Sequence, residues 1–437
     1  MNHALRNLVL IALRNLAQHT RRTLLLGGAI AGVTALLVML MGLSTGMHNV
    51  MLESATTLMT GHINVAGFFK VTPGQAGPIV TRYKQVEELL RKEVPELDYI
   101  TQRGRGWAKL ISDTASMQVG IGGIDIRREP GFRKVIQVVS GNLDDLAQPG
   151  TLLIFEEQAT KLEVKVGDTL TFSAPTPRGT NNTIDVRVVA IARNVGLLSS
   201  FNTFIPDESL RQLYQLNEDT TGALMLYLKD IQQVSVVQER LRKVLPAAGY
   251  TLMEYDPRPF FMKFQSVARE DWTGQRLDIT KWEDEIAFIA WTSTVLTFLS
   301  GMLMFVLMVI ISIGIMNTLW IAIRERTREI GTLRAIGMQS NQVALMFMIE
   351  AFLLSLISTL VGVVLGLIAS WGLNAANVAV PKAVQLFLMS ERLHLVPSGG
   401  SVVSSIAIIV VCTTLVALFP SYLAARLKPV TAMHKIG

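Results

Sequence analysis

Four long runs of apolar residues interrupt an otherwise mixed pattern of polar and apolar positions. We predict a transmembrane helix in each, over residues 21–49, 286–323, 341–374 and 398–425. Each run exceeds the roughly 20 residues that a helix needs to cross a bilayer. The second run holds 38 residues without Asp, Glu, Lys or Arg. As a helix it would reach roughly 57 Å, against a hydrocarbon core of roughly 30 Å, so we expect a stalk that continues outside the membrane.

Residues 50–285, between the first two runs, have the shorter periodicities of a folded domain. Runs of β-branched residues bounded by Gly, Pro, Asn and Asp predict strands over 117–125, 151–157, 168–174 and 183–193. Helical periodicity predicts helices over 85–94, 205–216 and 232–245, the second capped near Asp207. Strands separated by helices indicate a compact α+β unit that could be divided into two lobes. Residues 173–183 are polar, contain Pro and Gly, and are expected to form a projecting loop.

Residues 1–20 form a separate pattern in front of the first run. Five apolar residues recur at helical spacing while Arg6 and Arg14 fall elsewhere on the wheel: Leu5, Leu8, Ala12, Leu13 and Leu16. This predicts an amphipathic helix on the inner membrane face. The alternative is a simple extension of the first spanning helix.

The distribution of basic residues sets the expected orientation of the spans. Eleven Arg and Lys residues lie before the first run, between the second and third, and after the fourth: Arg6, Arg14, Arg21, Arg22, Arg324, Arg326, Arg328, Arg334, Arg426, Lys428 and Lys435. The loop at 375–397 holds only Lys382 and Arg392. Since basic residues accumulate on the cytoplasmic side, both termini, including the tail at 426–437, are expected there. Residues 50–285 would then be periplasmic, on a protein of the cytoplasmic (inner) membrane.

The composition of the chain mainly excludes classes of function. Half of the 437 residues are hydrophobic and 17% are charged, against about 25% in soluble domains, which favours a membrane protein. The net charge of +6 is explained by arginines that flank apolar runs, so we expect no nucleic-acid partner. The chain has no Gly-x-x-x-x-Gly-Lys-Ser/Thr loop, no Gly-x-Ser-x-Gly motif, and no His or Cys at metal-ligand spacing. We expect no catalytic residue, metal or cofactor in this chain, so energy for transport would come from another subunit.

The segment 324–340 carries more than a membrane anchor requires. Its charges alternate in sign at the start, and Ile330, Leu333 and Gly337 fall on one side of a helical wheel with Arg334 off it. Gly337 suits a helix C-terminus, and Ser340 or Asn341 could cap the next helix. Anchoring alone would explain the arginines but neither the glutamates nor the glycines. We therefore predict a short interaction helix parallel to the membrane.

Three features inside the apolar runs carry further hypotheses. Glu350 is costly there unless it is neutral, faces water or reaches a partner such as Arg22 or Arg324, and a structural role weighs as much as a functional one. Glycines spaced by four residues permit close helix contact: Gly28, Gly32, Gly362 and Gly366. Methionine adapts to varied apolar ligands, so methionines of the first two spans could line a substrate groove. The alternative is ordinary packing. The residues concerned are Met39, Met41, Met47, Met302, Met304 and Met308.

The segment order and one cytoplasmic motif resemble a known superfamily. The stretch REIGTLRAIGMQSNQVALMFMIEA over 328–351 resembles the ABC-transporter permeases of the MacB/FtsX/lipoprotein-releasing superfamily. Within it, the chain looks most like the LolC/LolE-type lipoprotein-releasing permeases. That narrower likeness rests on RNLAQHTRRTLL (14–25), TGHINV (60–65), VGIGGIDIRREP (119–130), EEQATKLEVKVGDTLTF (156–172) and PSYLAARLKPVTAMH (420–434).

The resemblance implies partners that spacing alone does not. A dimer of a separate ATPase, which would bind ATP and Mg, would seat on 324–340 as a coupling helix. Its coupling residues would be Arg324, Glu325, Arg328, Glu329, Gly331, Arg334 and Gly337. A second permease, identical or a sister chain, would complete a V-shaped interface open to membrane lipids and to lipoprotein acyl chains. The periplasmic domain would meet a lipoprotein carrier or adaptor, for which the loop at 173–183 is the candidate.

The expected function is therefore that of the permease subunit of an ABC transporter, which couples ATP hydrolysis by its partner to periplasmic movement. The leading hypothesis for the transported substrate is a lipoprotein, extracted from the inner membrane. Two alternatives stay open, namely MacB-type mechanotransmission that exports drugs or peptides, and FtsX-like signalling to a cell-wall hydrolase. The usually smaller external domain of FtsX-type proteins disfavours the last.

Overall fold

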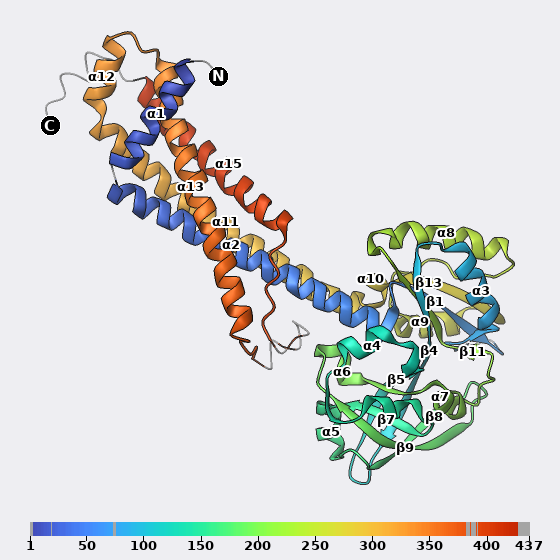
Figure 1. Cartoon of the computed structure of the whole chain (residues 1–437). Helices are drawn as coiled ribbons and strands as arrows, with labels where there is room; N and C mark the ends of the chain where they lie inside the picture. Colours follow the sequence, from blue (N-terminus) through green and yellow to red (C-terminus); the bar gives the residue numbers. More distant parts are fainter. Residues whose placement is uncertain are drawn as a thin grey trace. The chain divides into compact units, whose positions relative to one another are not determined.

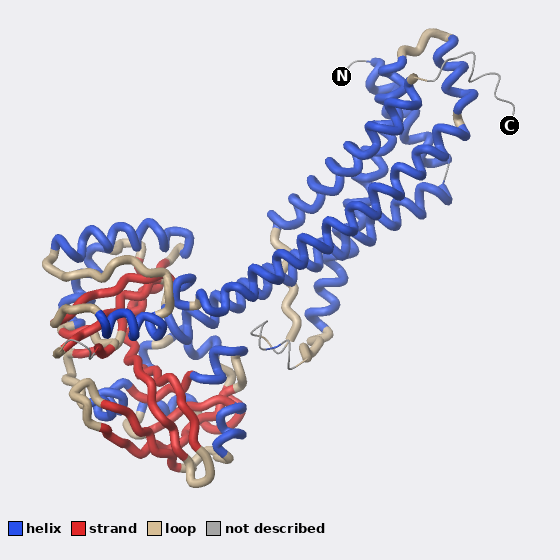
Figure 2. The backbone as a smooth tube through the Cα atoms, turned by 180° about the vertical axis from the view of Figure 1, so that it is seen from behind, coloured by secondary structure: helices blue, strands red, loops and turns tan. Residues whose placement is uncertain are grey.

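The structure, a computed structural model, describes residues 3–18, 20–72, 76–381, 385, 390 and 392–426. The chain folds as two compact units (Figures 1 and 2). A helical unit comprises Met1–His48, Ser293–Val380 and Arg392–Gly437, and an α+β unit comprises Asn49–Thr292 with Pro381–Glu391. The tail expected at 426–437 lies outside the described residues from residue 427 onward, as does Lys382.

Among the described residues, four helices are long and apolar enough to cross a membrane: Thr23–Thr60, Thr297–Glu325, Ser340–Ala375 and Gly399–Ala425. The predicted four-span architecture, with a mixed α and β domain between the first two spans, is confirmed. The helices that carry them are α2 (Thr20–Ala55), α11 (Ala287–Glu325), α13 (Ser340–Ala375) and α15 (Gly399–Ala425). Two shorter helices are α1 (His3–Gln18) and α12 (Thr327–Ala335).

Helix α2 does not end near residue 49, where the polar residues begin. It continues to Ala55 and tightens into a π-helical turn, η1 (Thr56–Thr60). The reason is burial, because Met51, Ala55 and Leu58 pack into a hydrophobic cluster of the α+β unit. Helix α11 is one continuous helix of 39 residues.

The helical unit is held together by two apolar clusters. The larger joins α2, α11, α13 and α15 through Ile30, Leu37, Met308, Ile311, Ile315, Leu319, Ala351, Ile409 and Ala417. The smaller, around Phe347, joins α12 to the neighbouring ends of α11, α13 and α15. Helix α1 lies beside α13 rather than in line with α2 (Figure 1). Its Ala12 and Leu16 are buried, but Leu13, predicted on the same apolar face, is exposed.

The α+β unit is built on one large sheet. Among the described residues, eleven strands form it in the order β13-β1-β12-β4-β5-β10-β7-β9-β6, with β2 beside β1 and β8 beside β4 and β9. Their bounds are β1 (Ile63–Lys70), β2 (Ala76–Gly77), β4 (Leu97–Ile111), β5 (Ser116–Ile124), β6 (Val138–Gly141), β7 (Thr151–Phe155), β8 (Thr169–Pro175), β9 (Asn181–Ala192), β10 (Asn202–Pro206), β12 (Ala223–Leu228) and β13 (Gly274–Lys281). A separate pair is formed by β3 (Val80–Thr81) and β11 (Thr220–Thr221).

Helices cover this sheet over two hydrophobic cores (Figure 1). The helices and short turns are α3 (Tyr83–Glu93), η2 (Ile126–Arg128), α4 (Pro130–Val135), η3 (Leu143–Ala147), α5 (Glu156–Leu162), α6 (Gly196–Phe201), α7 (Asp207–Tyr214), η4 (Ile231–Gln233), α8 (Val234–Ala247), α9 (Phe260–Arg269) and α10 (Trp282–Glu285). One core lies under α3 and α8, the other under α5 and α7. Strand β4 serves both, pairing with β12 over Leu97–Arg103 and with β5 over Gly104–Ile111.

The seven elements predicted from pattern in this domain are all found, displaced by a few residues at their ends. Two details differ. Asp207 is the first residue of α7 and pairs with Arg211, while Pro206 occupies the cap position. Residues 173–183 are mostly strand, because β8 runs to Pro175 and β9 begins at Asn181, which leaves a five-residue turn instead of a long loop.

Candidate coupling segment and the anchor of the α+β domain

The charged segment after the second span folds as a helix set between α11 and α13. Arg326 is the joint between α11 and α12, because its N–H bonds Ala322 O at 3.1 Å and its carbonyl accepts the N–H of Ile330 at 2.9 Å. At the other end, Gly337 has φ +110°, a left-handed conformation that glycine adopts without strain. The N–H of Met338 bonds Leu333 O at 3.0 Å, as in a Schellman motif. The expectation that Gly337 terminates this helix is confirmed.

The inward side of α12 differs from the predicted one. Ile330 and Gly331 are buried, but Leu333 is 37% exposed. Arg334, placed off the apolar side by the wheel, is half-buried and donates from Nη1 to Ala425 O at 3.2 Å. The reason is that residues 330 and 334 lie one turn apart and both face the ends of α13 and α15, which the sequence of α12 alone does not reveal.

The outward side of α12 presents charge. Arg324, Glu325, Arg328 and Glu329 are exposed, and Ile336 is 81% exposed at the helix end. The next helix is capped differently from the prediction, because the N–H of Gln339 donates to Gln342 Oε1 at 3.0 Å while Ser340 is the first helical residue. The exposed face is thus a compact charged surface on a short, well-terminated helix.

Glu350 has a partner that the sequence did not single out. Its Oε2 accepts a hydrogen bond from Arg326 Nη1 at 3.1 Å and lies 3.5 Å from Asn15 Nδ2 of α1. Both charged side chains are buried, with exposed fractions of 6% and 4%. The proposed partner Arg324 is instead exposed, and the side chain of Arg22 is not among those described. From the sequence, Arg326 was considered only as one of the basic residues of the loop. The feature that could have pointed to it was Glu350, a lone acidic residue inside the next apolar helix.

The glycines of α13 make the predicted close helix contact, and those of α2 make none within the described chain. A Cβ on Gly362 would lie 2.5 Å from Ala31 O, and one on Gly366 would lie 2.9 Å from Ala35 O. Helix α13 therefore meets α2 at these two glycines. Gly28 and Gly32 have no atom within 4 Å of a Cβ in the described chain. Both glycines are exposed, and Ala31 and Ala35 make the contact of α2 with α13 instead.

Three of the six candidate groove methionines belong to one apolar cluster, and the other three do not. Met308 is buried in the apolar cluster of the helical unit, and Met41 and Met304 pack against the same cluster. Met47 is buried, Met39 is half-buried and Met302 is 57% exposed. The structure thus brings Met41, Met304 and Met308 together as packing residues. Contact with a substrate stays a prediction.

In the α+β unit, the end of α2 is held by two arginines of β4. Arg103 donates from Nη1 to Leu58 O at 3.0 Å and from Nη2 to Thr57 O at 3.2 Å. Arg105 donates from Nη2 to Met59 O at 2.9 Å. These carbonyls belong to the final turn, where helix carbonyls lack internal partners and attract cations. Arg103 also pairs with buried Glu129 at 2.7 Å.

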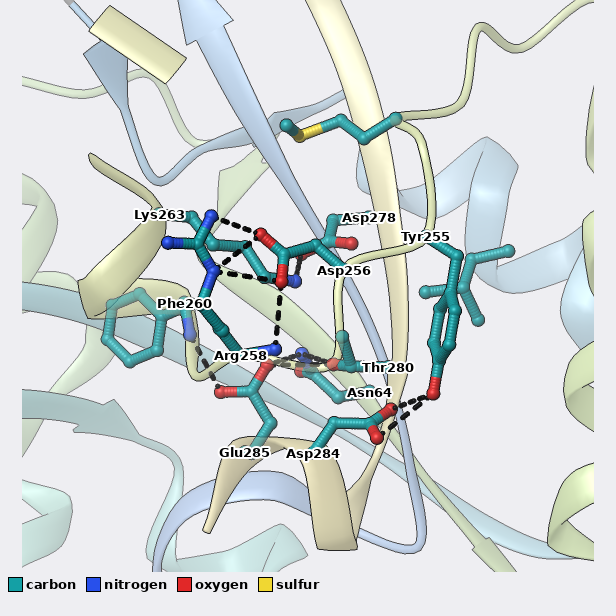
Figure 3. Close-up of polar contacts among 12 residues, drawn as sticks. Asn64, Tyr255, Asp256, Arg258, Phe260, Lys263, Asp278, Thr280, Asp284 and Glu285 are labelled. Atoms are coloured by element: carbon teal, nitrogen blue, oxygen red, sulfur yellow. Dashed lines mark hydrogen bonds and ion pairs between the residues drawn. The ribbon is translucent and has the colours of Figure 1, made fainter. Parts of the chain in front are cut away.

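A buried polar network continues from this turn to the start of α11. Arg105 Nη2 also donates to Asn64 Oδ1 at 2.9 Å, and Asn64 Nδ2 donates to Glu285 Oε1 at 3.3 Å. Glu285 further accepts from Thr280 Oγ1 at 2.7 Å and from the N–H of Phe260 at 3.2 Å (Figure 3). Glu285 is the last residue of α10, two positions before α11. Hydrogen bonds therefore connect the exit of the first long helix with the entry of the second.

Two more ion pairs support the network. Lys263 of α9 contacts Asp278 of β13 at 2.6 Å, with both side chains 1% exposed, and Arg258 contacts Asp256 at 2.6 Å (Figure 3). Burial raises the pKa of Asp278, and the neighbouring Lys263 opposes that shift. Burial lowers the pKa of Arg105, and the charge of Glu285 opposes that shift. Each buried charge is thus set against an opposite one, as such groups require.

Sequence reasoning missed these anchoring residues. Strand β4 was not predicted, because the stretch QRGRGW (102–107) lacks the alternation of apolar and polar residues that marks a half-buried strand. The alternating Arg and Gly were the available signal, since Gly104 and Gly106 leave room for Leu210 and Tyr214. The stretch TGHINV over 60–65 proves to be the turn between η1 and β1, with Gly61 at φ +65°.

The turn at 176–180 borders a groove rather than standing free. Gly179 has φ +87°, and its N–H bonds Thr176 O at 2.9 Å. The groove has a volume of about 590 Å³ and a largely apolar lining that includes Trp107, Pro177 and Phe264. The candidate partner-binding loop is therefore one wall of an apolar groove.

Comparison with known proteins places the C-terminal part of the chain. Residues 301–429 match the family model described as FtsX-like permease C-terminal. These residues are therefore similar to an FtsX-like permease domain. The domain includes α12, Arg326, Glu350 and the two packing glycines of α13.

Two curated relatives share about a third of the chain. The macrolide export ATP-binding/permease protein MacB of Bordetella avium is 32% identical over 148 residues, which is 33% of this chain and 20% of that protein. The pyoverdine export ATP-binding/permease protein PvdT of Pseudomonas putida is 30% identical over 142 residues, 32% of this chain and 19% of that protein. The matched part thus spans about a fifth of the length of each relative.

Two solved structures are similar to the chain at a TM-score of 0.30. One is the extracellular domain of the ABC-type transporter YknZ from Gram-positive bacteria, 11% identical, over 49% of this chain and 98% of that one. The other is the periplasmic region of MacB from Actinobacillus actinomycetemcomitans, 14% identical, over 44% and 86%. A TM-score of this size does not establish a common fold.

Proposed function

We propose that this chain is the permease subunit of an ABC transporter and that α12 is the helix on which a separate ATPase acts. One observation carries the proposal: a short, charged and exposed helix lies between two spanning helices of an FtsX-like permease domain. Ile330 and Arg334 fix its inner side to α13 and α15. A push on its charged face would therefore reach the spanning helices directly.

The orientation follows from charge. The basic residues around α12 and in front of α2 support a cytoplasmic position for both ends of the helical unit, where ATP is available. The α+β unit then lies in the periplasm, on a protein of the inner membrane. A movement of the spanning helices would enter that unit at the turn held by Arg103 and Arg105 and at Glu285.

For the substrate, we propose a lipoprotein extracted from the outer leaflet of the inner membrane. The support is the likeness of several segments to lipoprotein-releasing permeases. A second permease copy, identical or a sister chain, would complete the path, and membrane lipids would border it. A lipoprotein carrier or adaptor would meet the α+β unit near the turn at 176–180, beside the apolar groove.

A second candidate function is export of a small molecule or peptide through a periplasmic partner. The observation in its favour is the naming of the relatives above for macrolide and pyoverdine export. Signalling to a cell-wall hydrolase is the third, supported by the FtsX-like permease domain alone.

Affinity purification of the full chain from its native membrane, followed by mass spectrometry, tests these proposals together. We expect an ABC ATPase with co-purifying lipoproteins. Recovery of the ATPase with a membrane-fusion adaptor and no lipoprotein would favour export. Recovery without any ATPase would contradict the permease proposal itself. A chain carrying Glu329→Lys, which reverses a charge on the exposed face of α12, serves as the control for the ATPase contact.

A further inference from the structure

Three elements converge on the carboxylate of Glu350. It lies in α13, it pairs with Arg326 at the joint between α11 and α12, and its Oε2 is 3.5 Å from Asn15 Nδ2 of α1. Glu350 is the one acidic residue in the sequence of α13, and the next acidic residue along the chain is Glu391. One carboxylate therefore connects the N-terminal helix, the second span and the third.

The position of Arg326 explains why its contact with Glu350 affects several helices. It is the residue where the chain leaves α11 and enters α12, with φ −97° and ψ +13°, outside the regular helical values. Its backbone bonds both helices, and its side chain bonds a third. The angle of the joint and the position of α13 are thus fixed by the same residue.

Burial makes this contact hard to replace. Arg326 and Glu350 are each at least nine-tenths buried, and Glu350 lines a largely apolar cavity together with Leu16, Ala322 and Ala351. Separating the two charges in such surroundings is strongly unfavourable, because water cannot replace the lost partner. Arg324 and Arg328, on either side, are exposed. The pair therefore holds when the exposed face of α12 is pushed.

We infer that Arg326 and Glu350 form a positioning pair that makes α12 move as one body with α13 and α1. This rests on the proposed function of α12 and adds the residues through which its displacement passes to the third span and the N-terminal helix. Without the pair, α12 would pivot about residue 326, and the ATPase would bind without driving the spans.

The test uses the full chain reconstituted with the ATPase recovered by purification. Two quantities are measured, the amount of ATPase bound and the ratio of ATP hydrolysis with and without the chain. For Arg326→Gln and for Glu350→Gln we expect the ratio to fall at least tenfold while the bound ATPase stays within twofold. The charge exchange Arg326→Glu with Glu350→Arg should recover most of the ratio. Arg187→Gln, the same change at an exposed position of β9 in the α+β unit, is the matched control and should leave both quantities unchanged.

Single variants leave one buried charge and could fail to accumulate in the membrane. Arg326→Leu with Glu350→Leu removes both charges, a change that buried pairs tolerate in stability. We expect this variant to fold and bind the ATPase but to lose the stimulation at least tenfold. Wild-type stimulation in the double leucine variant would overturn the inference alone. Absence of stimulation by the wild-type chain would overturn the proposed function and the inference with it.

Discussion

At the residue scale, single side chains decide where the long helices are held. Gly362 and Gly366 let α13 reach the backbone of α2, and Arg103 and Arg105 hold the last carbonyls of the first long helix. The sequence identified the glycines of α13 from their spacing. It could not identify the two arginines, because their acceptors are backbone atoms about 45 residues away.

We expect Gly362→Val to destabilise the helical unit. The added Cβ would lie 2.5 Å from Ala31 O and 2.6 Å from Thr34 Cβ, both on a packed helix. Overpacking of this kind costs about 1–3 kcal/mol. The unfolding temperature of the purified chain in detergent measures the effect. Gly28→Val is the matched control, since no atom of the described residues lies within 4 Å of its added Cβ. An equal loss in both variants would contradict the packing described.

The α+β unit should lose stability in acid through His62. Burial lowers the pKa of His62 from its ordinary 6.5, although the charge of Asp98 opposes the shift. Its Nδ1 accepts the N–H of Leu228 at 3.0 Å, which only an unprotonated nitrogen can do. Because the folded-state pKa is depressed, the stabilising contribution is present above pH 6.5 and is lost as the pH falls below it.

Unfolding temperatures of the full chain between pH 8 and pH 5 check this expectation. His62→Gln keeps an acceptor for Leu228 and cannot be protonated, so it should flatten the decline. His48→Gln, at an exposed position of α2, is the control and should leave the decline as in the wild type. An identical decline in the wild type and in His62→Gln would show that other groups cause it.

At the element scale, α12 combines an inner side that packs with an outer side that is charged. Its helical state and its glycine terminator were predictable from local pattern. Its orientation was not, because Leu333 and Arg334 exchange the roles that a helical wheel gives them once α13 and α15 are in place. For a short helix at a junction, packing against its neighbours decides which side faces inward more than its own pattern of apolar residues does.

Two changes in α12 should uncouple the ATPase without preventing insertion of the chain. Glu329→Lys reverses an exposed charge, and Gly331→Pro removes a backbone N–H in the middle of a nine-residue helix. We expect stimulated ATP hydrolysis to be abolished in both, with normal amounts of chain in the membrane. Glu239→Lys, the same charge reversal on exposed α8, is the control. Full stimulation in both α12 variants would refute the coupling role.

At the scale of the whole molecule, two units are joined by two long helices, each of which has residues in both. In the α+β unit, β4 spans the two cores, and the network around Asn64 and Glu285 ties the two helix ends to each other. This arrangement suits transmission of movement because the two helices enter one sheet at adjacent strands, β1 and β13.

The orientation of the two units can be tested with cysteine labelling. Cys412 is the single cysteine, so Cys412→Ser gives a background without thiols. On it, Val236→Cys lies exposed on α8, and Ile336→Cys lies exposed at the end of α12. A membrane-impermeant maleimide should label the first in cells with an opened outer membrane and the second only after the inner membrane is broken. The reverse labelling would invert the topology.

The sequence by itself determined the number of spans, the place of the α+β domain between them and the charged helix, because these depend on local hydrophobicity and periodicity. Tertiary structure alone decided which residues meet. Glu350 meets Arg326 rather than Arg324, Gly362 meets Ala31 while Gly28 is exposed, and Arg105 reaches Met59. Each of these contacts joins positions far apart in the chain or set by the rotation of a helix about its axis. A local pattern fixes what an element is, and only packing fixes which way it faces.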